Sequence, residues 1–325
     1  MLVNITIPTY NRSRCIGQAV AAALGQSYTD TVVTVVDDGS TDATRAALVP
    51  FFLDPRFCYI RLAENRGTAG AKNASLLLSK YDAITFHDSD DLPDLHKIMI
   101  QQRALDIPGH VADPICDWKT LGHEPGSELQ VETVFTAHNF IKADGKVHLI
   151  NNRISLIDDF FPNLQFPSKT EGDWILVNSA LFRRDVFRRL GGYLNSIEED
   201  RELRNRVIAS GTITYFVERP LLDKIEMHDS LTVQESTNYK ASHRVDDRRA
   251  VWERTQLYRR LLFAGENRPT REEIQVPIDL QVDIAEVSNP ALIKFNSDLP
   301  MTEATRAAFS SFADRSAVGE FTSQP

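Results

Sequence analysis

Residues 31–41 read TVVTVVDDGST and decide the fold. Residues Thr31 to Val36 are short, apolar and largely without alternation, which is typical of a strand buried on both faces of a parallel sheet. Asp37-Asp38-Gly39-Ser40 follow directly and predict a polar turn at the end of this strand. Considered alone, this acidic turn is equally consistent with a helix cap that binds no ligand.

The same order of strand, polar turn and helix extends on both sides of this segment. Further strands are predicted at Leu2–Pro8, Phe57–Leu62 and Asp82–Phe86. Helices are predicted near 14–24, 42–52 and 69–79, with Ser13 as N-cap of the first and Ser40 or Thr41 as cap of the second. Strands that alternate with helices indicate an α/β fold with a mostly parallel central sheet flanked by helices.

The remainder of the chain is less regular. Residues 101–170 predict long loops with strands at 131–135 and 146–149, and order returns at 174–178. Helices near 184–190 and 201–209 and a strand at 213–217 follow. An amphipathic helix is expected at 240–264, and a frayed tail at 313–325.

Composition narrows the classes of function. The 325 residues carry a formal net charge of -9 without a basic stripe, which argues against a nucleic-acid partner. Three cysteines without CxxC spacing indicate reduced thiols of a cytoplasmic protein. The sequence predicts neither a secretion signal nor a membrane-spanning segment, while peripheral membrane contact stays open.

Polar clusters end all four predicted strands. They are Pro8-Thr9-Tyr10-Asn11, Asp37 to Ser40, Glu64-Asn65-Arg66-Gly67 and His87-Asp88-Ser89-Asp90-Asp91. In an open parallel sheet these ends share one edge, where such folds bind ligands. We therefore expect one binding site made of the four clusters.

The chemistry of this edge indicates a cation. Neither GxGxxG nor GxxxxGK[ST] occurs, so the usual backbone cradles for phosphate are missing. The carboxylates of Asp88, Asp90 and Asp91 at a strand end can hold a hard divalent ion such as Mg²⁺ or Mn²⁺, which also binds substrate phosphates.

The motifs PTYN, VDDGSTD, ENRGTAGAKN and HDSDD, followed by Glu199-Asp200 and Met227-His228-Asp229-Ser230, resemble the glycosyltransferases of family 2 with the GT-A fold. The resemblance implies a GT-A nucleotide-diphospho-sugar transferase domain at 1–230. Residues 1–100 would form its nucleotide-binding half and 101–230 its acceptor-binding half. Residues 231–325 would form a C-terminal helical extension.

By position, the resemblance also implies the donor site. Asp38 would accept a hydrogen bond from uracil N3–H, and Lys72 stands where the family often has Arg. Asp90, Asp88 and His228 would hold the metal, and Asp91 would support them or cap a following helix whose first turn contains Pro93. The nucleotide-sugar contacts would come from Pro8, Thr9, Tyr10, Asn11, Asp38, Asn65, Gly67, Lys72, Asp88 and Ser89.

Asp200 resembles the general base of inverting members, and Glu199 is the adjacent candidate. Because neighbouring residues on a helix point apart, we expect only one of the two to face the site. Without the resemblance, residues 198–200 would be interpreted as an acidic first turn that favours the helix dipole.

The function expected is inverting transfer of a hexosyl or N-acetylhexosaminyl group from a UDP-sugar to a carbohydrate or lipid-linked glycan acceptor. The setting would be bacterial polysaccharide or glycoconjugate synthesis in the cytoplasm or at the inner face of the membrane. The helix at 240–264 would pack on the catalytic domain, form a homodimer or position a lipid-linked acceptor. Two alternatives stay open: an inactive nucleotide-sugar-binding protein, and a sugar nucleotidyltransferase, although the latter calls for a GGxGTR-like turn.

Overall fold

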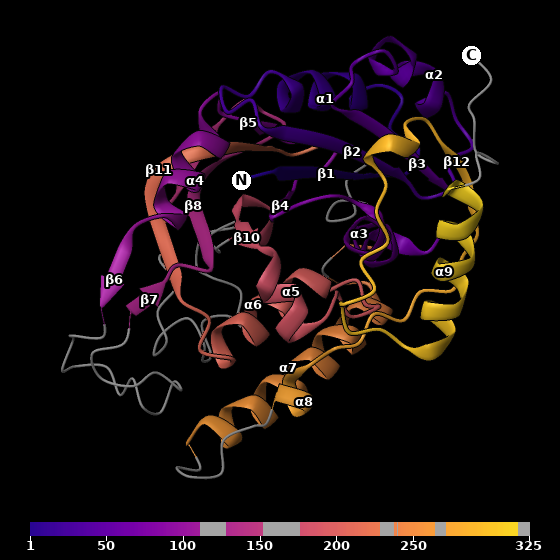
Figure 1. The fold of residues 1–325 in the computed structure, drawn as a ribbon. Coiled ribbons are helices and arrows are strands. Elements are labelled where there is room, and N and C mark those ends of the chain that lie inside the picture. The colour runs from indigo at the N-terminus through magenta and orange to yellow at the C-terminus, as the bar shows by residue number, and fades with distance from the viewer. Residues whose placement is uncertain (111–127, 152–175, 228–236, 239, 264–270, 318–325) are drawn as a thin grey trace.

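The computed structural model of the chain describes residues 1–110, 128–151, 176–227, 237–238, 240–263 and 271–317. Its first hundred residues alternate strands and helices as the sequence predicts (Figure 1). Every residue of the first two strands is buried, as expected for the middle of a covered sheet. The elements are β1 (Val3–Thr9), α1 (Ile16–Leu24), β2 (Thr31–Asp37), α2 (Thr44–Leu48), β3 (Phe57–Leu62), α3 (Gly67–Leu78) and β4 (Ala83–Phe86).

The central sheet has the order β12-β3-β2-β1-β4-β10-β8-β11-β5, and β9 also pairs with β8. The strands β1 to β4 are mutually parallel, and β8 is parallel to β11. The carboxyl ends of β1 to β4 therefore share one edge, which confirms the expected position of the polar clusters. The other strands are β5 (Leu92–Pro93), β8 (Thr133–Ile141), β9 (Val147–Ile150), β10 (Leu181–Arg183), β11 (Thr214–Ile225) and β12 (Ile284–Val287).

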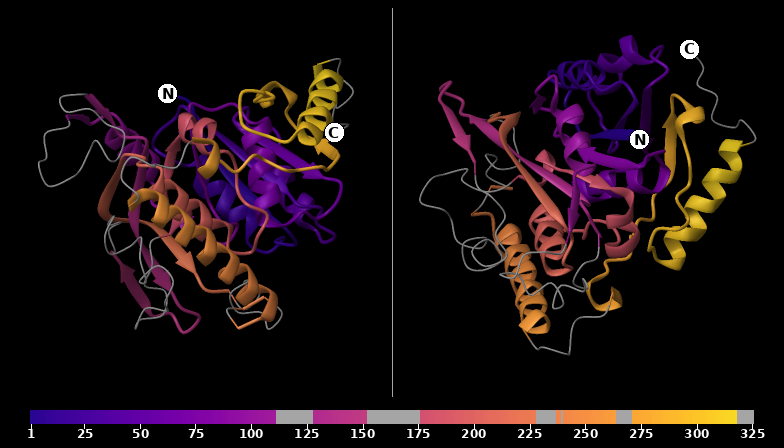
Figure 2. Two further views of the ribbon diagram at one scale, coloured as in Figure 1. Left: turned by 90° about the horizontal axis from the view of Figure 1, so that it is seen from below. Right: turned by 60° about the vertical axis from the view of Figure 1, so that its left-hand side comes forward.

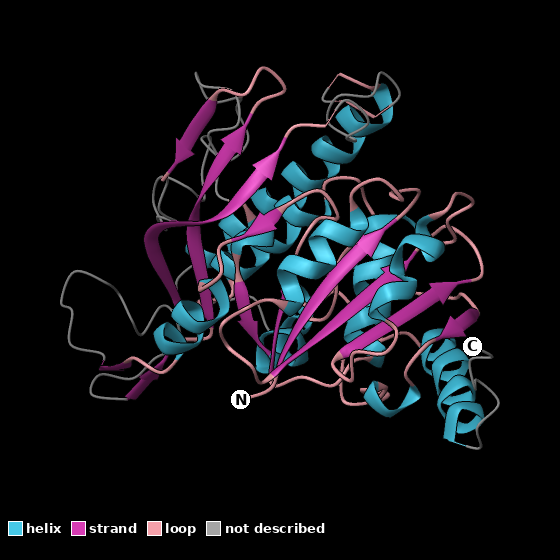
Figure 3. Cartoon of the chain, turned by 90° about the horizontal axis from the view of Figure 1, so that it is seen from above, coloured by secondary structure: helices cyan, strands magenta, loops and turns pink. Residues whose placement is uncertain are grey.

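Helices cover the sheet on both faces (Figure 3). Val33 and Val35 of β2 pack in one apolar cluster with Ile16 and Val20 of α1. Val36 points to the opposite cluster, which contains residues of α3, α5 (Arg184–Leu190) and α6 (Glu199–Ala209), because successive strand residues face opposite sides. A separate two-stranded sheet joins β6 (Pro108–His110) to β7 (Glu128–Gln130).

The second half of the chain agrees with the predicted elements and extends them. The strands expected at 131–135 and 146–149 are β8 and β9, and the helix expected near 184–190 is α5. The strand expected at 213–217 continues to Ile225 as β11. This extension brings Lys224 to the carboxyl end of the sheet.

The C-terminal segment packs against the rest of the protein. It contains α7 (Ser242–Phe263), α8 (Arg271–Ile274), β12 and α9 (Glu303–Ala317). The strand β12 pairs antiparallel with β3, so this segment supplies an edge strand of the central sheet as well as helices. Two views in Figure 2 show α7 and α9 on different sides of the domain. The helix α9 continues five residues into the tail expected to fray, and residues 318–325 lie outside the described ranges.

The predicted helix caps are wrong. The residue before α1 is Cys15 and not Ser13, and the residue before α2 is Ala43 and not Ser40 or Thr41. Neither Cys15 nor Ala43 makes a capping hydrogen bond through its side chain. The hydroxyl of Ser40 instead accepts a hydrogen bond from the backbone N–H of Asn11 at 2.9 Å. The turn after β2 therefore ties neighbouring strand ends together instead of capping a helix.

Within the described ranges, none of the helices combines the length and apolar character that crossing a bilayer requires.

Candidate active site

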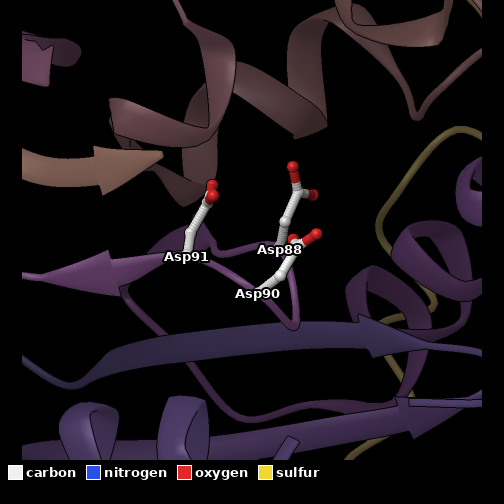
Figure 4. Close-up of side chains that lie close together, drawn as sticks. All are labelled: Asp88, Asp90 and Asp91. Atoms are coloured by element: carbon white, nitrogen blue, oxygen red, sulfur yellow. The ribbon is translucent and has the colours of Figure 1, made fainter. Parts of the chain in front are cut away.

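Three aspartates gather directly after β4. One carboxylate oxygen from each of Asp88, Asp90 and Asp91 lies within 4.8 Å of the other two. Their side chains extend to the same side of the loop (Figure 4). Burial raises the pKa of Asp91 well above its usual range, and the negative charges of Asp88 and Asp90 act in the same direction. An oxygen-only, anionic donor set of this kind fits Mg²⁺ or Mn²⁺.

Two side chains from distant segments hold Asp88. The amide of Asn178 donates to Oδ1 at 2.7 Å, and Nζ of Lys224 lies 3.2 Å from Oδ2. Although burial alone would raise the pKa of Asp88, Lys224 and Lys72 together lower it below its usual value. Asn178 and Lys224 were not among the residues predicted from the sequence, because neither belongs to a motif and both lie far along the chain from Asp88.

The segment after Asp91 is not a helix, so its predicted role as a helix cap is wrong. Leu92 and Pro93 form β5, which pairs antiparallel with β11. The next helix, α4 (Lys97–Leu105), begins only after His96. Asp91 is fully buried, and Ser89 beside it is also buried. The predicted metal ligand His228 lies outside the described residues.

The two aspartates at the end of β2 have different roles. Asp37 accepts hydrogen bonds from the backbone N–H of Ser40 at 2.8 Å and from the hydroxyl of Tyr59 at 2.6 Å, so it stabilises the turn. Oδ1 of Asp38 accepts from the backbone N–H of Arg66 at 2.7 Å. Burial raises the pKa of Asp38 to about 7, against the effect of this backbone hydrogen bond. The backbone hydrogen bond offsets only part of the cost of burying the Asp38 carboxylate. A ligand that donates a further N–H could offset more of this cost.

The turn after β1 is fastened to the turn after β2. Asn11 has a φ of 53°, and its side-chain oxygen accepts from the backbone N–H of Thr41 at 2.8 Å. Pro8 and Thr9 are buried at the end of β1, while Tyr10 is 43% exposed. The exposed ring of Tyr10 is therefore accessible to a ligand, whereas Asn11 is used within the protein.

The turn after β3 lies against the turn after β2. Gly39 has a φ of +77°, and a Cβ there would lie 3.2 Å from the backbone nitrogen of Asn65. The exposed side chain of Asn65 accepts from the backbone N–H of Gly67, which starts α3 with a φ of +75°. The expected donor-site residues of β1, β2 and β3 thus lie on adjoining turns.

Lys72 of α3 is fully buried and connects to the start of α6. Its Nζ lies 2.6 Å from Oδ1 of Asp200 and 3.2 Å from Oε1 of Glu199. Although burial alone would lower it, these two carboxylates hold the pKa of Lys72 well above its usual value. Burial raises the pKa of Glu199 to about 7 even though Lys72 opposes the shift.

The two acidic neighbours share one partner, and the expectation that only one of them faces the site stays a prediction. Glu199 and Asp200 diverge at their Cα atoms, but both carboxylates reach the same lysine nitrogen. The flexible side chains converge because a buried ammonium group needs anionic partners. The two carboxylates differ in access to solvent: the side chain of Asp200 is 31% exposed and that of Glu199 is 9% exposed.

Asn178 links the aspartate cluster to this carboxylate pair. Its amide nitrogen donates to Asp88, and its oxygen lies 3.4 Å from Nζ of Lys72. The amine of Lys72 also lies 4.8 Å from the centre of the Tyr193 ring. Asn73, the next residue of α3, holds Tyr193 in place through hydrogen bonds of 2.8 and 2.9 Å to its backbone.

Comparison with known proteins shows which families and chains this sequence is similar to. Residues 4–153 match the model of glycosyl transferase family 2. The chain is 40% identical over 102 residues to succinoglycan biosynthesis protein ExoO of Rhizobium meliloti (strain 1021), covering 31% of this chain and 29% of that protein. It is 34% identical over 100 residues to the Escherichia coli UDP-Glc:alpha-D-GlcNAc-diphosphoundecaprenol beta-1,3-glucosyltransferase WfgD, covering 31% of this chain and 39% of that protein. These matches thus span well under half of either relative.

Solved structures give the same class of fold. The structure of S. aureus TarS 1-349 in complex with UDP-GlcNAc superposes with a TM-score of 0.55 at 13% identity, covering 79% of this chain and 66% of that one. The fold is that of a GT-A domain. Residues 4–153 thus match glycosyltransferase family 2, and the relatives to which the chain is similar are glycosyltransferases or polysaccharide-synthesis proteins.

Proposed function

We propose that this protein is an inverting glycosyltransferase that moves a sugar from a UDP-sugar to an acceptor hydroxyl. One structural observation supports the proposal most strongly. The aspartate cluster after β4 and the carboxylates at the start of α6 are joined through Asn178 and Lys72. The proposed site for the leaving diphosphate and the proposed general base would therefore belong to one hydrogen-bonded assembly.

The turns after β1, β2 and β3 would bind the nucleotide. The carboxylate of Asp38 is the proposed acceptor for uracil N3–H, and the exposed ring of Tyr10 is the proposed stacking surface. Asp88 and Asp90 would hold Mg²⁺ or Mn²⁺, which when bound stabilises negative charge on the departing diphosphate. Asn178 and Lys224 keep Asp88 oriented for this role.

Asp200 is better placed than Glu199 to act as the base, because its carboxylate is the more exposed of the two. It would take the proton from the acceptor hydroxyl while that oxygen forms a bond to the anomeric carbon. The bond from the anomeric carbon to the diphosphate breaks at the same time, and UDP leaves with the electron pair. A single displacement of this kind inverts the configuration at the anomeric carbon.

Relatives suggest the biological setting. The names of two of them refer to succinoglycan biosynthesis and to glucosyl transfer onto a diphosphoundecaprenol-linked sugar. From these names we infer that this protein acts in bacterial polysaccharide or glycoconjugate synthesis. Its acceptor would be a carbohydrate or a lipid-linked glycan at the cytoplasmic face of the membrane. Transfer of a hexosyl or N-acetylhexosaminyl group is the corresponding reaction.

A donor panel with Mn²⁺ tests the reaction, using UDP-glucose, UDP-galactose and their N-acetylhexosamine counterparts. We expect one donor to be hydrolysed slowly without acceptor and Asp200→Asn to abolish that turnover while calorimetric UDP binding persists. Glu199→Gln is the matched control and should retain more activity. Tight UDP binding without turnover of any donor would favour an inactive binding protein, and pyrophosphate release from UTP would favour a nucleotidyltransferase.

A further inference from the structure

The helix α7 packs beside α6, the helix that begins with the proposed catalytic pair (Figure 1). Glu198 lies immediately before this pair, and its side chain is 3% exposed. Its carboxylate contacts Arg201 of α6, whose Nε lies 2.7 Å from Oε2, and two arginines of α7. Nε of Arg244 lies 2.8 Å from Oε1, and Arg248 contacts the same oxygen at 3.3 Å.

Asp247 of α7 holds the residues that lead into α6. One of its oxygens accepts from the hydroxyl of Ser196 at 2.8 Å and from the backbone N–H of Ile197 at 2.9 Å. Farther along the two helices, Asn205 donates to the hydroxyl of Thr255 at 2.8 Å. These contacts fix both the entry to α6 and its direction relative to α7.

The contacts at Glu198 constrain the helix more than apolar packing would. Apolar contacts tolerate sliding, whereas a charge-assisted hydrogen bond from an arginine to a buried carboxylate constrains both distance and direction. Burial would raise the pKa of Glu198, but Arg201 and Arg244 hold it below its usual value. The acidic triplet is thus anchored from two sides: Glu198 by Arg244 and Arg248 of α7 together with Arg201 of its own helix, and the two following carboxylates by Lys72 of α3.

We propose that Arg244, assisted by Arg248 and Asp247, is a positioning residue that sets the location of the Asp200 carboxylate. The inference rests on the proposed role of Asp200 as the base. It makes α7 part of the catalytic apparatus, although this helix lies beyond the residues that match the family model. Arg244 acts through the backbone at the start of α6 and needs no contact with substrate.

The test compares Arg244→Met with Arg249→Met in the full chain. Arg249 lies on the same helix with its side chain 68% exposed, so it is a matched control. We expect Arg244→Met to lower kcat on the donor identified by the panel by roughly 10- to 100-fold without changing donor KM. Arg244→Lys should recover part of kcat, and Arg249→Met should match the unaltered protein. Equal kcat values for the two Met variants would overturn the proposal.

A double variant separates positioning from folding. Glu198→Gln combined with Arg244→Met removes the two most buried charges of this cluster, and the arginines that lose the carboxylate, Arg201 and Arg248, have side chains that are 22% and 27% exposed. We expect this variant to fold while kcat stays low, and full recovery of kcat would overturn the proposal.

Hydrogen exchange at the backbone amides of residues 199–205 gives a readout that needs no turnover. Exchange should be faster in Arg244→Met than in Arg249→Met, and equal rates would count against the proposal. If the unaltered protein turned over no donor, the proposed function would fail, while the exchange result would still decide whether Arg244 holds α6.

Discussion

The amine of Lys72 joins both acidic residues at the start of α6, at 2.6 Å from Asp200 and 3.2 Å from Glu199. Removing this fully buried cation leaves Glu199 buried without its ionic partner. We expect Lys72→Met to lower the free energy of unfolding by about 3–5 kcal/mol, as for other broken buried ion pairs. Urea unfolding measures the loss.

A surface pair gives the control for this prediction. Lys146 pairs with Asp144, and both side chains are mostly exposed. Lys146→Met should leave the unfolding midpoint essentially unchanged, because water and salt screen exposed ion pairs. If both lysine variants unfolded at the same urea concentration, Lys72 would not stabilise the protein through its charge.

The aspartate cluster predicts that nucleotide binding depends on a divalent ion. Calorimetry should show UDP binding that Mn²⁺ strengthens and EDTA reverses, and Asp90→Asn should remove this effect. Asn178→Ala should weaken the apparent affinity for Mn²⁺ by roughly 10- to 100-fold, because residues that orient metal ligands have effects of that size. Binding that is identical with Mn²⁺ and with EDTA would rule out the metal site.

The raised pKa of Asp38 predicts a pH dependence of donor binding. Burial raises this pKa to about 7, so the carboxyl group gains a proton as the pH falls through neutrality. The ionised form is the better acceptor for uracil N3–H. The affinity for a UDP-sugar should therefore fall by up to about 10-fold per pH unit below roughly pH 7. Calorimetry in buffers above and below neutrality measures it.

Two variants identify the titrating group. Asp38→Asn should bind weakly, with an affinity that no longer changes with pH. Burial also raises the pKa of Glu199 to about 7, so Glu199→Gln is needed to exclude a contribution from that residue. If the pH dependence persisted in Asp38→Asn and vanished in Glu199→Gln, the titrating group would be Glu199, and the prediction for Asp38 would be wrong.

Gly191 is a position where any side chain should disrupt the fold. It has a φ of +80°, and a Cβ there would lie 1.9 Å from the backbone oxygen of Val276. Gly145 has a similar φ of +81°, but a Cβ there meets no atom within 4 Å. Gly145→Ala should cost about 1–3 kcal/mol in unfolding free energy from backbone strain alone. Gly191→Ala should cost distinctly more, and equal costs would contradict the contact with Val276.

Much of the donor side of the site was predictable from the sequence, because it follows from local pattern. Buried strands followed by polar turns have to bring their turns to one edge when the strands are parallel, so Asp38 and Asp88 were expected at the same edge of the sheet. Asn178 and Lys224 were not predictable, because the short turn before the antiparallel strand β10 and the long strand β11 bring them to Asp88. No spacing rule links residues that meet through such non-local pairing.

The acidic stretch before α6 shows a second limit of prediction. Its charges were consistent with a catalytic pair or with a favourable helix dipole. The structure shows that Glu198 binds arginines of α7, whereas Glu199 and Asp200 bind a lysine of α3. Which cation each carboxylate meets depends on how α3 and α7 pack around α6, and the local sequence carries no information about this packing.

The pairing of β12 with β3 has a consequence for biosynthesis. The ribosome makes β3 early and β12 much later, so during translation the nascent domain exposes an open row of backbone N–H and C=O groups along β3. Such an unpaired edge can recruit strands from other molecules. Successful production of this protein in a heterologous host should therefore depend on chaperones that bind the nascent chain until β12 emerges.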